Sequence, residues 1–493
     1  MNLDEYRTLD ATALAALVAA REVTPEELLD LARQRADAVN PALNAIVMRL
    51  DGAAIDQVAR GVDGPLAGVP FLIKDLAQEY QGYPTSSGSK ALARDVAKQH
   101  SNVVQRFLDA GLVIFGKTNT PEFGAKGVTE SEYWGPAHNP WHTDHTPGGS
   151  SGGSGAAVAA GIVPVAGAND GGGSIRIPAA CNGLVGLKPS RGLSPFGSAL
   201  GEVMFGMAVQ GAVTRTVRDA AAVYDAIYGP TASSVYPTPS ATTPFTEQIT
   251  TPPTKLRIGY STASAINPSP DREAIAAVEH AAQLLTELGH HVEEVTPPYD
   301  DAALAKDFLT VWFAWVAHEI DDAKALGASD SDFEADTLAM GELGRSAGVV
   351  PAFRALSHVN DYVLSLESFH RDHDYFLTPT LATPPLRIGA TTTSPLLQRA
   401  SRVIAKAHAG NLLARTGILD DLIEQSLGWV PYTQLANLTG RPAISVPLHW
   451  TATGLPLGVQ FVGRLGSDGD LLALAAQLEQ AAPWVQRYAD ISL

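Results

Sequence analysis

The sequence predicts an α/β fold in which helices cover a central β-sheet. Short apolar runs alternate with segments of helical periodicity from residue 66 onward, and such alternation favours a sheet covered by helices. Several runs are apolar at consecutive positions, as expected for strands that are buried on both faces. No repeat recurs at a spacing of about 20 to 50 residues, which excludes a solenoid.

Two amphipathic helices are expected before the first strand. The apolar positions of residues 1–23 recur with helical spacing, and a second helix begins after Thr24, which can cap it. Pro25 suits the first turn and Glu27 can close a capping box. We expect residues 1–60 to form a helical collar and residues 61–493 to form an α/β domain, the two making one structural unit.

The remaining elements follow from the apolar runs. Helical patterns include residues 103–110 and 470–478. Residues 229–254 are dominated by Thr, Pro and Ser without a helix or strand period, which predicts a surface connection. The expected strands lie within residues 68–75 (GVPFLIKD), 111–119 (GLVIFGKTN), 161–170 (GIVPVAGAND), 255–260 (KLRIGY), 375–380 (YFLTPT), 442–448 (PAISVPL) and 455–463 (LPLGVQFVG).

Composition excludes several classes of function. The chain has 493 residues, with 34 Lys and Arg against 52 Asp and Glu and a net charge of −18. The basic residues form no run, so we expect no nucleic-acid partner. With 45% apolar residues the chain can build a core without disulfides. Its single cysteine, Cys181, excludes an intramolecular disulfide and a cysteine-based metal site, and it favours a reducing compartment.

Two segments bear on location. Residues 1–23 carry acidic residues where a signal peptide has basic ones. Residues 146–169 are uncharged but consist largely of Gly, Ser and Ala with two prolines, and they lack the ~20 predominantly apolar residues that a membrane helix needs. We therefore expect a cytoplasmic protein that does not insert into a membrane.

Glycines concentrate in residues 147–178 (PGGSSGGSGAAVAAGIVPVAGANDGGGSIRIP). Glycine costs backbone entropy, so this segment is either a flexible linker or a place where the backbone approaches a ligand. A linker is disfavoured because AAVAAGIVPVAG has the pattern of a small-residue helix followed by a buried strand. Residues 148–152 also match G-x-S-x-G, but the preceding HNPWHTDHTP does not form the strand that this motif requires.

Cofactor and metal motifs are missing or out of context. Residues 87–90 match S-x-x-K, but they lie in a predicted loop and lack the partner motifs. The chain has no P-loop and no dinucleotide-binding glycine pattern, so we expect no cofactor. His138, His142 and His145 lie close together, but no H-E-x-x-H accompanies them. We interpret them as exposed or hydrogen-bonding histidines and expect no metal.

Three residues combine into a candidate for nucleophilic catalysis. Lys74 ends an apolar run, while Ser150 and Ser174 lie in two glycine loops 24 residues apart, about the length of one helix and one strand. That spacing can bring both loops to the same edge of the sheet. A lysine takes a proton from a serine only when it is neutral. Lowering its pKa from ~10.4 to ~7 costs ~4.6 kcal/mol, which burial can supply. On its own, a lysine at a strand end is more often solvated or ion-paired.

The second glycine loop, residues 170–174 (DGGGS), lets successive backbone N–H groups converge without side chains between them. An oxyanion hole requires such donors, and losing one typically costs ~3 kcal/mol in barrier height. A purely structural glycine turn is the alternative.

With these residues identified, the chain resembles the amidase signature family from about residue 14 to residue 484. The matching segments, in order, are GVPFLIKD, GKTNTPEF, NPWHTDHTPGGSSGGSGAAVAAG, NDGGGSIRIPAACNGLVGLKPSRG, GRPAISVPL and GLPLGVQFVG. The resemblance implies a mixed, twisted central sheet covered on both faces by helices. It also implies hydrolysis of carboxamide C–N bonds through an acyl-enzyme, with no cofactor.

The resemblance further implies a role for each site residue. Ser174 would be the nucleophile, Ser150 a bridging serine that follows a cis peptide bond, and Lys74 the base. One departure from the family pattern is Gly171, where Thr is common. The backbone N–H groups of Gly171, Gly172, Gly173 and Ser174 would form the oxyanion hole, while Ser151, Asp170 and Arg176 would support the triad and its loop.

The substrate is less sharply defined. The chain is similar to bacterial amidases of the 6-aminohexanoate-cyclic-dimer hydrolase type, which implies a small-molecule partner: a hydrophobic linear or cyclic amide, an ester or a carbamate (urethane). The alternatives are the catalytic subunit of a glutamine-dependent tRNA amidotransferase and a non-catalytic binding protein. We interpret Trp312, Phe313 and Trp315 as core packing, because aromatic residues at helical spacing are usually buried. Whether the chain forms a homodimer stays open.

Overall fold

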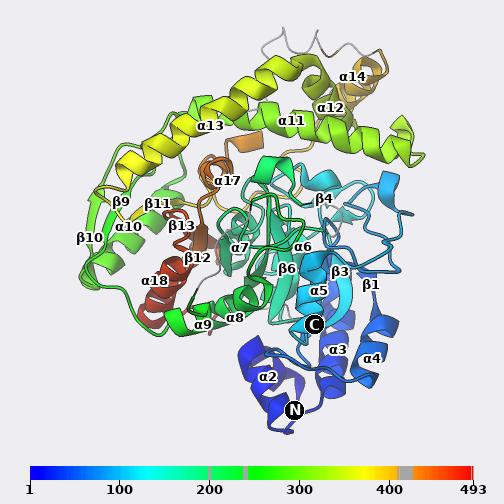
Figure 1. Ribbon diagram of the computed structural model, residues 1–493, viewed down its shortest axis with the longest axis vertical. Coiled ribbons are helices and arrows are strands. Elements are labelled where there is room, and N and C mark those ends of the chain that lie inside the picture. Colours follow the sequence, from blue (N-terminus) through cyan, green and yellow to red (C-terminus); the bar gives the residue numbers. More distant parts are fainter. Residues whose placement is uncertain (198–200, 237–241, 408–409, 411–425, 490, 492–493) are drawn as a thin grey trace.

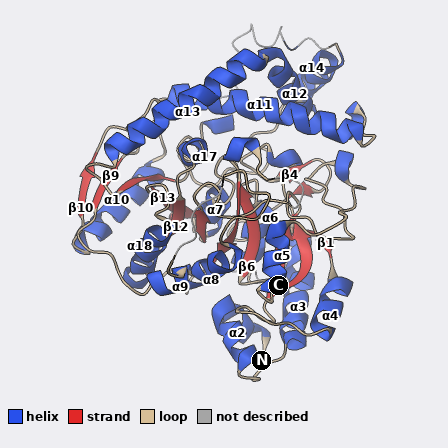
Figure 2. Ribbon diagram, in the orientation of Figure 1, coloured by secondary structure: helices blue, strands red, loops and turns tan. Residues whose placement is uncertain are grey.

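The computed structural model describes residues 1–197, 201–236, 242–407, 410, 426–489 and 491. These residues form an eleven-stranded sheet with the strand order β1-β3-β2-β6-β8-β7-β12-β13-β11-β9-β10, and helices lie on both of its faces (Figures 1 and 2). Neighbouring strands run parallel at β3-β2-β6 and at β11-β9-β10 and antiparallel elsewhere. The predicted α/β class and the mixed sheet are therefore confirmed.

Each apolar run of the sequence contains a strand. Every residue of β2, β3, β6, β7, β8, β11 and β13 is buried, as consecutive apolar positions require. The strands are β1 (Ile46–Arg49), β2 (Pro70–Lys74), β3 (Val113–Thr118), β6 (Val165–Asp170), β7 (Val185–Lys188), β8 (Val209–Thr214), β9 (Arg257–Tyr260), β10 (His291–Glu294), β11 (Tyr375–Pro379), β12 (Ala443–Trp450) and β13 (Pro456–Val462), with β4 (Glu130–Ser131) and β5 (Gly135–Pro136) as a separate pair.

The N-terminal region contains three helices before residue 44, where the sequence predicted two. Asp10 divides the first of them, because its side chain accepts a hydrogen bond from the N–H of Ala13 and starts a new helix. The capping box predicted at Thr24 and Glu27 is confirmed. The collar helices are α1 (Leu3–Thr8), α2 (Ala11–Ala19), α3 (Pro25–Leu43) and α4 (Asp51–Ala59), at the bottom of Figure 1. The division of the chain at residue 60 stays a prediction.

Further helices pack along the sheet. The two predicted from the sequence are confirmed, as α5 and, with longer bounds, α18. Residues 229–254 form a connection with one short helix, α9 (Phe245–Gln248), which the sequence pattern did not predict, and residues 237–241 lie outside the described residues. The helices beside the sheet are α5 (Asn102–Asp109), α6 (Gly152–Ala159), α7 (Arg176–Asn182), α8 (Val217–Ile227), α10 (Arg272–Glu287) and α18 (Asp468–Ala481).

A layer of long helices lies over one edge of the sheet, at the top of Figure 1. Its inner side forms a second apolar cluster that includes Phe308, Leu309 and Phe313. This layer encloses the space above the glycine loops. Its helices are α11 (Asp301–Ala325), α12 (Ala335–Ala347), α13 (Val349–Phe369) and α14 (Pro395–Lys406), with the short α17 (Gln434–Thr439) beneath them. Across the described ranges, no helix is both long and apolar enough to cross a membrane.

Candidate active site

Two neighbouring strands position the predicted base. Lys74 is the last residue of β2, and Asp170 is the last residue of β6. The strands run parallel, with Leu72 opposite Ala166, so their carboxyl ends reach the same edge of the sheet. The glycine loop that contains Ser150 leads into α6, and the one that contains Ser174 follows β6 and leads into α7. Both loops lie at this edge.

Lys74 is fully buried, and two polar atoms contact its amine. Lys74 Nζ donates to Ser150 Oγ at 2.8 Å and to Asn169 Oδ1 at 2.7 Å. Burial lowers the pKa of Lys74 well below its usual value, and the nearby carboxylate of Asp170 opposes this only in part. The site therefore favours the neutral amine, the form that accepts a proton.

Ser150 follows a cis peptide bond, Gly149-Ser150, as the family resemblance implies. Two glycines that lie close to Ser150 in space, Gly149 and Gly124, leave no room for a side chain. A Cβ on Gly149 would lie 2.6 Å from the carbonyl oxygen of Val128, and a Cβ on Gly124 would lie 3.0 Å from Ser150 Oγ. The glycines therefore let backbone segments close tightly around the hydroxyl.

Ser174 lies on the wall of a cavity of about 310 Å³. The structure thus brings Lys74 and Ser150 into hydrogen-bonding contact and places Ser174 where a ligand can reach it. Within the described ranges, no hydrogen bond joins Ser150 to Ser174. Ser151, predicted to support the triad, donates from its Oγ to the carbonyl oxygen of Asn169 at 3.3 Å and so braces the end of β6.

The loop at residues 170–174 differs from the prediction at Gly173. Its N–H donates to Asp170 Oδ1 at 2.7 Å. This predicted oxyanion donor is therefore already bonded to the Asp170 carboxylate. Gly173 instead forms the turn, with a φ of 125° that favours glycine. The N–H groups of Gly171, Gly172 and Ser174 donate to no acceptor in the described part of the chain, which leaves three donors for a ligand oxygen.

Asp170 and Arg176 organise this loop through a buried ion pair. Arg176 Nε contacts Asp170 Oδ2 at 3.0 Å and Nη2 contacts Oδ1 at 3.0 Å, and neither side chain is exposed. Burial alone would raise the pKa of Asp170, but the charge and hydrogen bonds of Arg176, together with Lys188 and Asn437, lower it to about 2. The carboxylate is therefore charged and available to hold the N–H groups of Gly173 and Ile175.

Asn169 is a site residue that the sequence reasoning missed. Its Oδ1 accepts from Lys74, and its Nδ2 donates to the carbonyl oxygen of Leu76 at 2.8 Å. The only sequence signal is its place at the end of a buried strand, directly before the glycine loop. Asn169 is thus the second hydrogen-bond partner of the buried amine.

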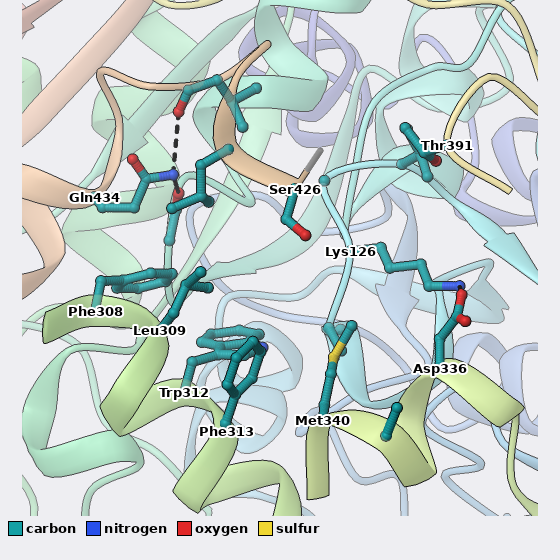
Figure 3. Close-up of a pocket in the computed structure, with 18 of the residues that line it drawn as sticks. Lys126, Phe308, Leu309, Trp312, Phe313, Asp336, Met340, Thr391, Ser426 and Gln434 are labelled. Atoms are coloured by element: carbon teal, nitrogen blue, oxygen red, sulfur yellow. Dashed lines mark hydrogen bonds and ion pairs between the residues drawn. The ribbon is translucent and has the colours of Figure 1, made fainter. Parts of the chain in front are cut away.

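The aromatic residues Trp312, Phe313 and Trp315 of α11 pack in or against the second apolar cluster, as predicted, but two of them also border the cavity. Trp312 and Phe313 line the cavity together with Phe308, whereas Trp315 is not part of its wall. The rings of Phe308 and Trp312 stack with centroids 5.4 Å apart. Helical spacing alone does not distinguish a core from a cavity wall, and α11 lies across the cavity. Figure 3 shows Phe308, Leu309, Trp312 and Phe313 projecting from one helix.

A polar group faces these aromatic side chains. Lys126 Nζ lies 2.8 Å from Asp336 Oδ2 and 3.3 Å from Glu334 Oε2, and Figure 3 shows the Lys126–Asp336 pair on the opposite side from Phe308. The cavity therefore combines a largely apolar wall with one ion-paired edge, a pattern typical of small-molecule sites.

The histidines at positions 138, 142 and 145 contact one another or the nearby backbone. The rings of His142 and His145 lie 4.5 Å apart, and His138 Nδ1 contacts the carbonyl oxygen of Thr143 at 2.7 Å. Among the described residues, no group of three or more His, Cys, Asp or Glu is arranged to hold a metal ion.

Comparison with known proteins agrees with this geometry. The Amidase family model matches residues 27–472. The chain is 36% identical to the putative amidase AmiC of Mycobacterium leprae, over 98% of this chain and 97% of that protein. It is also 36% identical to the 6-aminohexanoate-cyclic-dimer hydrolase of Pseudomonas sp. (strain NK87), over 97% and 96% of the two chains.

A solved structure extends the likeness to three dimensions. The structure of a 6-aminohexanoate cyclic dimer hydrolase complexed with substrate superimposes with a TM-score of 0.91 and 34% identity, and the match covers 98% of this chain and 99% of that one. Since the family model, the relatives and the fold all span nearly the whole chain, the protein belongs to the amidase signature family and is an amidohydrolase, a hydrolase that acts on amide bonds.

Proposed function

We propose that this amidohydrolase cleaves carboxamide C–N bonds through an acyl-enzyme on Ser174, with Ser150 as the proton relay and Lys74 as the base. One observation supports this most directly: a fully buried lysine amine lies 2.8 Å from Ser150 Oγ, at the sheet edge where Ser174 opens onto an apolar cavity. Burial lowers the pKa of this amine well below its usual value, which favours the neutral form that accepts a proton.

The first half of the reaction transfers the acyl group to the enzyme. Ser174 Oγ attacks the carbonyl carbon while its proton passes to Ser150 Oγ, whose own proton passes to Lys74 Nζ. The carbonyl oxygen becomes an oxyanion held by the N–H groups of Gly171, Gly172 and Ser174. The C–N bond then breaks as the Lys74 ammonium returns a proton through Ser150 to the departing nitrogen, which leaves an ester on Ser174.

The second half releases the acid. Water attacks the ester carbon and gives a proton through Ser150 to Lys74. The bond to Ser174 Oγ then breaks as the proton returns to that oxygen. The same relay serves both halves, and in each half it carries a proton to Lys74 and then returns it.

The cavity supports a hydrophobic substrate class. Phe308, Trp312 and Phe313 supply broad aromatic surface near Ser174. We infer that linear and cyclic amides with apolar groups fit best, with esters and carbamates as further substrates of the same acyl-transfer chemistry. Two relatives are named 6-aminohexanoate-cyclic-dimer hydrolase and acylamidase, which supports this range. The single cysteine favours a reducing compartment such as the cytoplasm.

Turnover by the isolated chain tests the proposal. The protein would be assayed on aryl anilides, linear and cyclic aliphatic amides, esters and carbamates, and treated with a fluorophosphonate before peptide mass spectrometry. We expect label on Ser174, and we expect Ser174→Ala to lose turnover by orders of magnitude while Ser357→Ala, at an exposed serine of α13, keeps it. Activity only with partner subunits and glutamine would instead favour the amidotransferase alternative, and an unlabelled, inactive protein would favour a binding role.

A further inference from the structure

A segment more than 250 residues downstream of the glycine loop at residues 170–174 packs directly against that loop. Thr433 precedes α17, and Gln434 and Asn437 lie within that helix. All three side chains are almost completely shielded, with exposed fractions of 0%, 2% and 0%. Each of them donates a hydrogen bond to the backbone of residues 170–172.

Two of these bonds converge on one carbonyl. The Gly172 oxygen accepts from Thr433 Oγ1 at 2.6 Å and from Gln434 Nε2 at 3.3 Å. At the other end of the same peptide unit, the Gly173 N–H donates to Asp170 Oδ1 at 2.7 Å. The peptide between Gly172 and Gly173 is therefore held at both its C=O and its N–H. Figure 3 shows Gln434 with hydrogen bonds drawn from its side-chain nitrogen.

Two other peptides of the loop, Asp170-Gly171 and Gly173-Ser174, are also fixed through their carbonyls. Asn437 Nδ2 donates to the carbonyl oxygen of Asp170 at 3.0 Å, and the N–H of Ile177 donates to the carbonyl oxygen of Gly173 at 2.7 Å. The C=O and N–H of a trans peptide point in opposite directions. Fixing these two carbonyls therefore also fixes the directions of the N–H groups of Gly171 and Ser174, two of the three unoccupied donors.

Thr433 sits too close to the loop for its contact to be incidental. A Cβ built on Gly173 would lie 2.6 Å from Thr433 Oγ1. The hydroxyl thus occupies space that any other residue at position 173 would fill, and its hydrogen bond is among the shortest in the site. Arg176 extends the same network, since its Nη1 donates to the carbonyl oxygen of Thr433 at 2.8 Å.

We propose that Thr433 is a positioning residue for the oxyanion hole: with Asn437 it holds the backbone of the glycine loop so that its N–H groups are aimed before substrate arrives. This inference rests on the proposed function. An oxyanion hole works through donors that need no reorganisation when charge develops. Loosening the loop should therefore weaken binding of the transition state and leave binding of the uncharged substrate almost unchanged.

Three variants isolate the hydroxyl. Thr433→Val removes it and keeps the shape, while Thr433→Ser restores it. Thr439→Val removes a hydroxyl from the same helix whose partner is the Leu435 carbonyl oxygen, not the loop. We expect Thr433→Val to lower kcat by about 10-fold to 100-fold with KM within about 3-fold, because the donors are weakened and not deleted. Thr433→Ser and Thr439→Val should both retain kcat within about 3-fold.

A transition-state analogue separates positioning from general destabilisation. A trifluoromethyl ketone accepts Ser174 Oγ at its carbonyl carbon, the serine proton passes through Ser150 to Lys74, and the resulting oxyanion requires the hole. Its affinity should fall in parallel with kcat in Thr433→Val, whereas a non-reactive amide inhibitor should bind as to the wild type. Equal losses for both inhibitors, or a loss of kcat in Thr433→Ser, would overturn the proposal.

The two proposals fail in different ways. Full activity of Ser174→Ala would remove the proposed function itself. Inactive Ser174→Ala together with wild-type kcat in Thr433→Val would leave the function intact and remove the role of Thr433. Thr433→Ala offers the same readout if Thr433→Val does not fold.

Discussion

Lys74 Nζ and Ser150 Oγ lie 2.8 Å apart, and neither side chain is more than 2% exposed. A base and a relay in one proton path act as a unit, so their removal should not be additive. We expect Lys74→Met and Ser150→Ala each to lower kcat by about 10²-fold to 10⁴-fold. The double variant should be little worse than the poorer single variant. Single-turnover acylation rates measure this directly, and multiplied losses would contradict a shared path.

Asn169 offers a test of the neutral lysine. Asn169→Asp would place a carboxylate where Oδ1 now lies, 2.7 Å from Lys74 Nζ. A negative charge favours the ammonium and raises the pKa of Lys74, opposing the lowering by burial. We expect the acid limb of the kcat/KM profile to move to higher pH, so that activity falls at neutral pH and recovers as pH rises.

Asn169→Leu is the matched variant, because it removes the acceptor without adding charge. Its acid limb should not move to higher pH, although turnover should fall. Identical profiles for the Asp and Leu variants would show that charge at this position does not control the base.

The sequence predicted the fold class and singled out the segments of the candidate site for physical reasons that did not extend to every neighbouring residue. Apolar runs identify buried strands, and Lys74 ends one of them. Ser150 and Ser174 lie in glycine-rich loops for which a flexible linker is disfavoured. The contact of Asn169 with Lys74 arises only when β2 and β6 pair. Likewise, the occupation of the Gly173 N–H depends on how the Asp170 side chain folds back, which no periodicity reveals.

The aromatic residues of α11 show a second limit. Trp312, Phe313 and Trp315 have the same chemical character and lie within one turn of each other, yet only the first two line the cavity. Helical periodicity predicts which residues share a face but not whether that face meets a core or an empty space. The break between α1 and α2 was not predicted, because it depends on a single residue, the capping Asp10.

Trp312 should control the affinity for bulky substrates. It stacks on Phe308 and borders the cavity near Gly171, where a Cβ would lie 3.2 Å from the Trp312 ring. Trp312→Ala removes part of the apolar wall, so KM for aryl amides should rise by about 10-fold or more, with a smaller change in kcat. Trp315→Ala serves as control, since Trp315 packs against His318 outside the wall. Equal KM changes in both variants would contradict this division.

Lys188 should make stability depend on pH. It is fully buried beside the Asp170–Arg176 pair, and its Nζ donates to the carbonyl oxygen of Pro189 at 2.7 Å. Burial lowers the pKa of Lys188 to about 7, with Asp170 opposing and Arg176 adding to the effect. In the unfolded chain the pKa returns to the ordinary lysine value of ~10.4.

The protons bound at Lys188 in the folded and unfolded chains determine whether the free energy of unfolding rises or falls with pH. Between pH about 7 and ~10.4 the unfolded chain holds one proton more at Lys188 than the folded chain does, so this residue makes the free energy of unfolding rise with pH. This gain in the free energy of unfolding is complete above pH ~10.4 and is lost as the pH falls to about 7. The largest slope for one proton is about 1.4 kcal/mol per pH unit.

Lys188→Met removes this contribution to the slope. Urea unfolding at several pH values between about 7 and 10 should show the free energy of unfolding of the variant, relative to the wild type, falling as pH rises. Lys98→Met, at an exposed lysine, should track the wild type throughout. The other buried lysines, Lys74 and Lys117, are present in all three proteins and cancel in the comparison. Parallel curves for Lys188→Met and wild type would mean that Lys188 keeps its proton when folded, so that the ion pair beside it and not burial determines its charge.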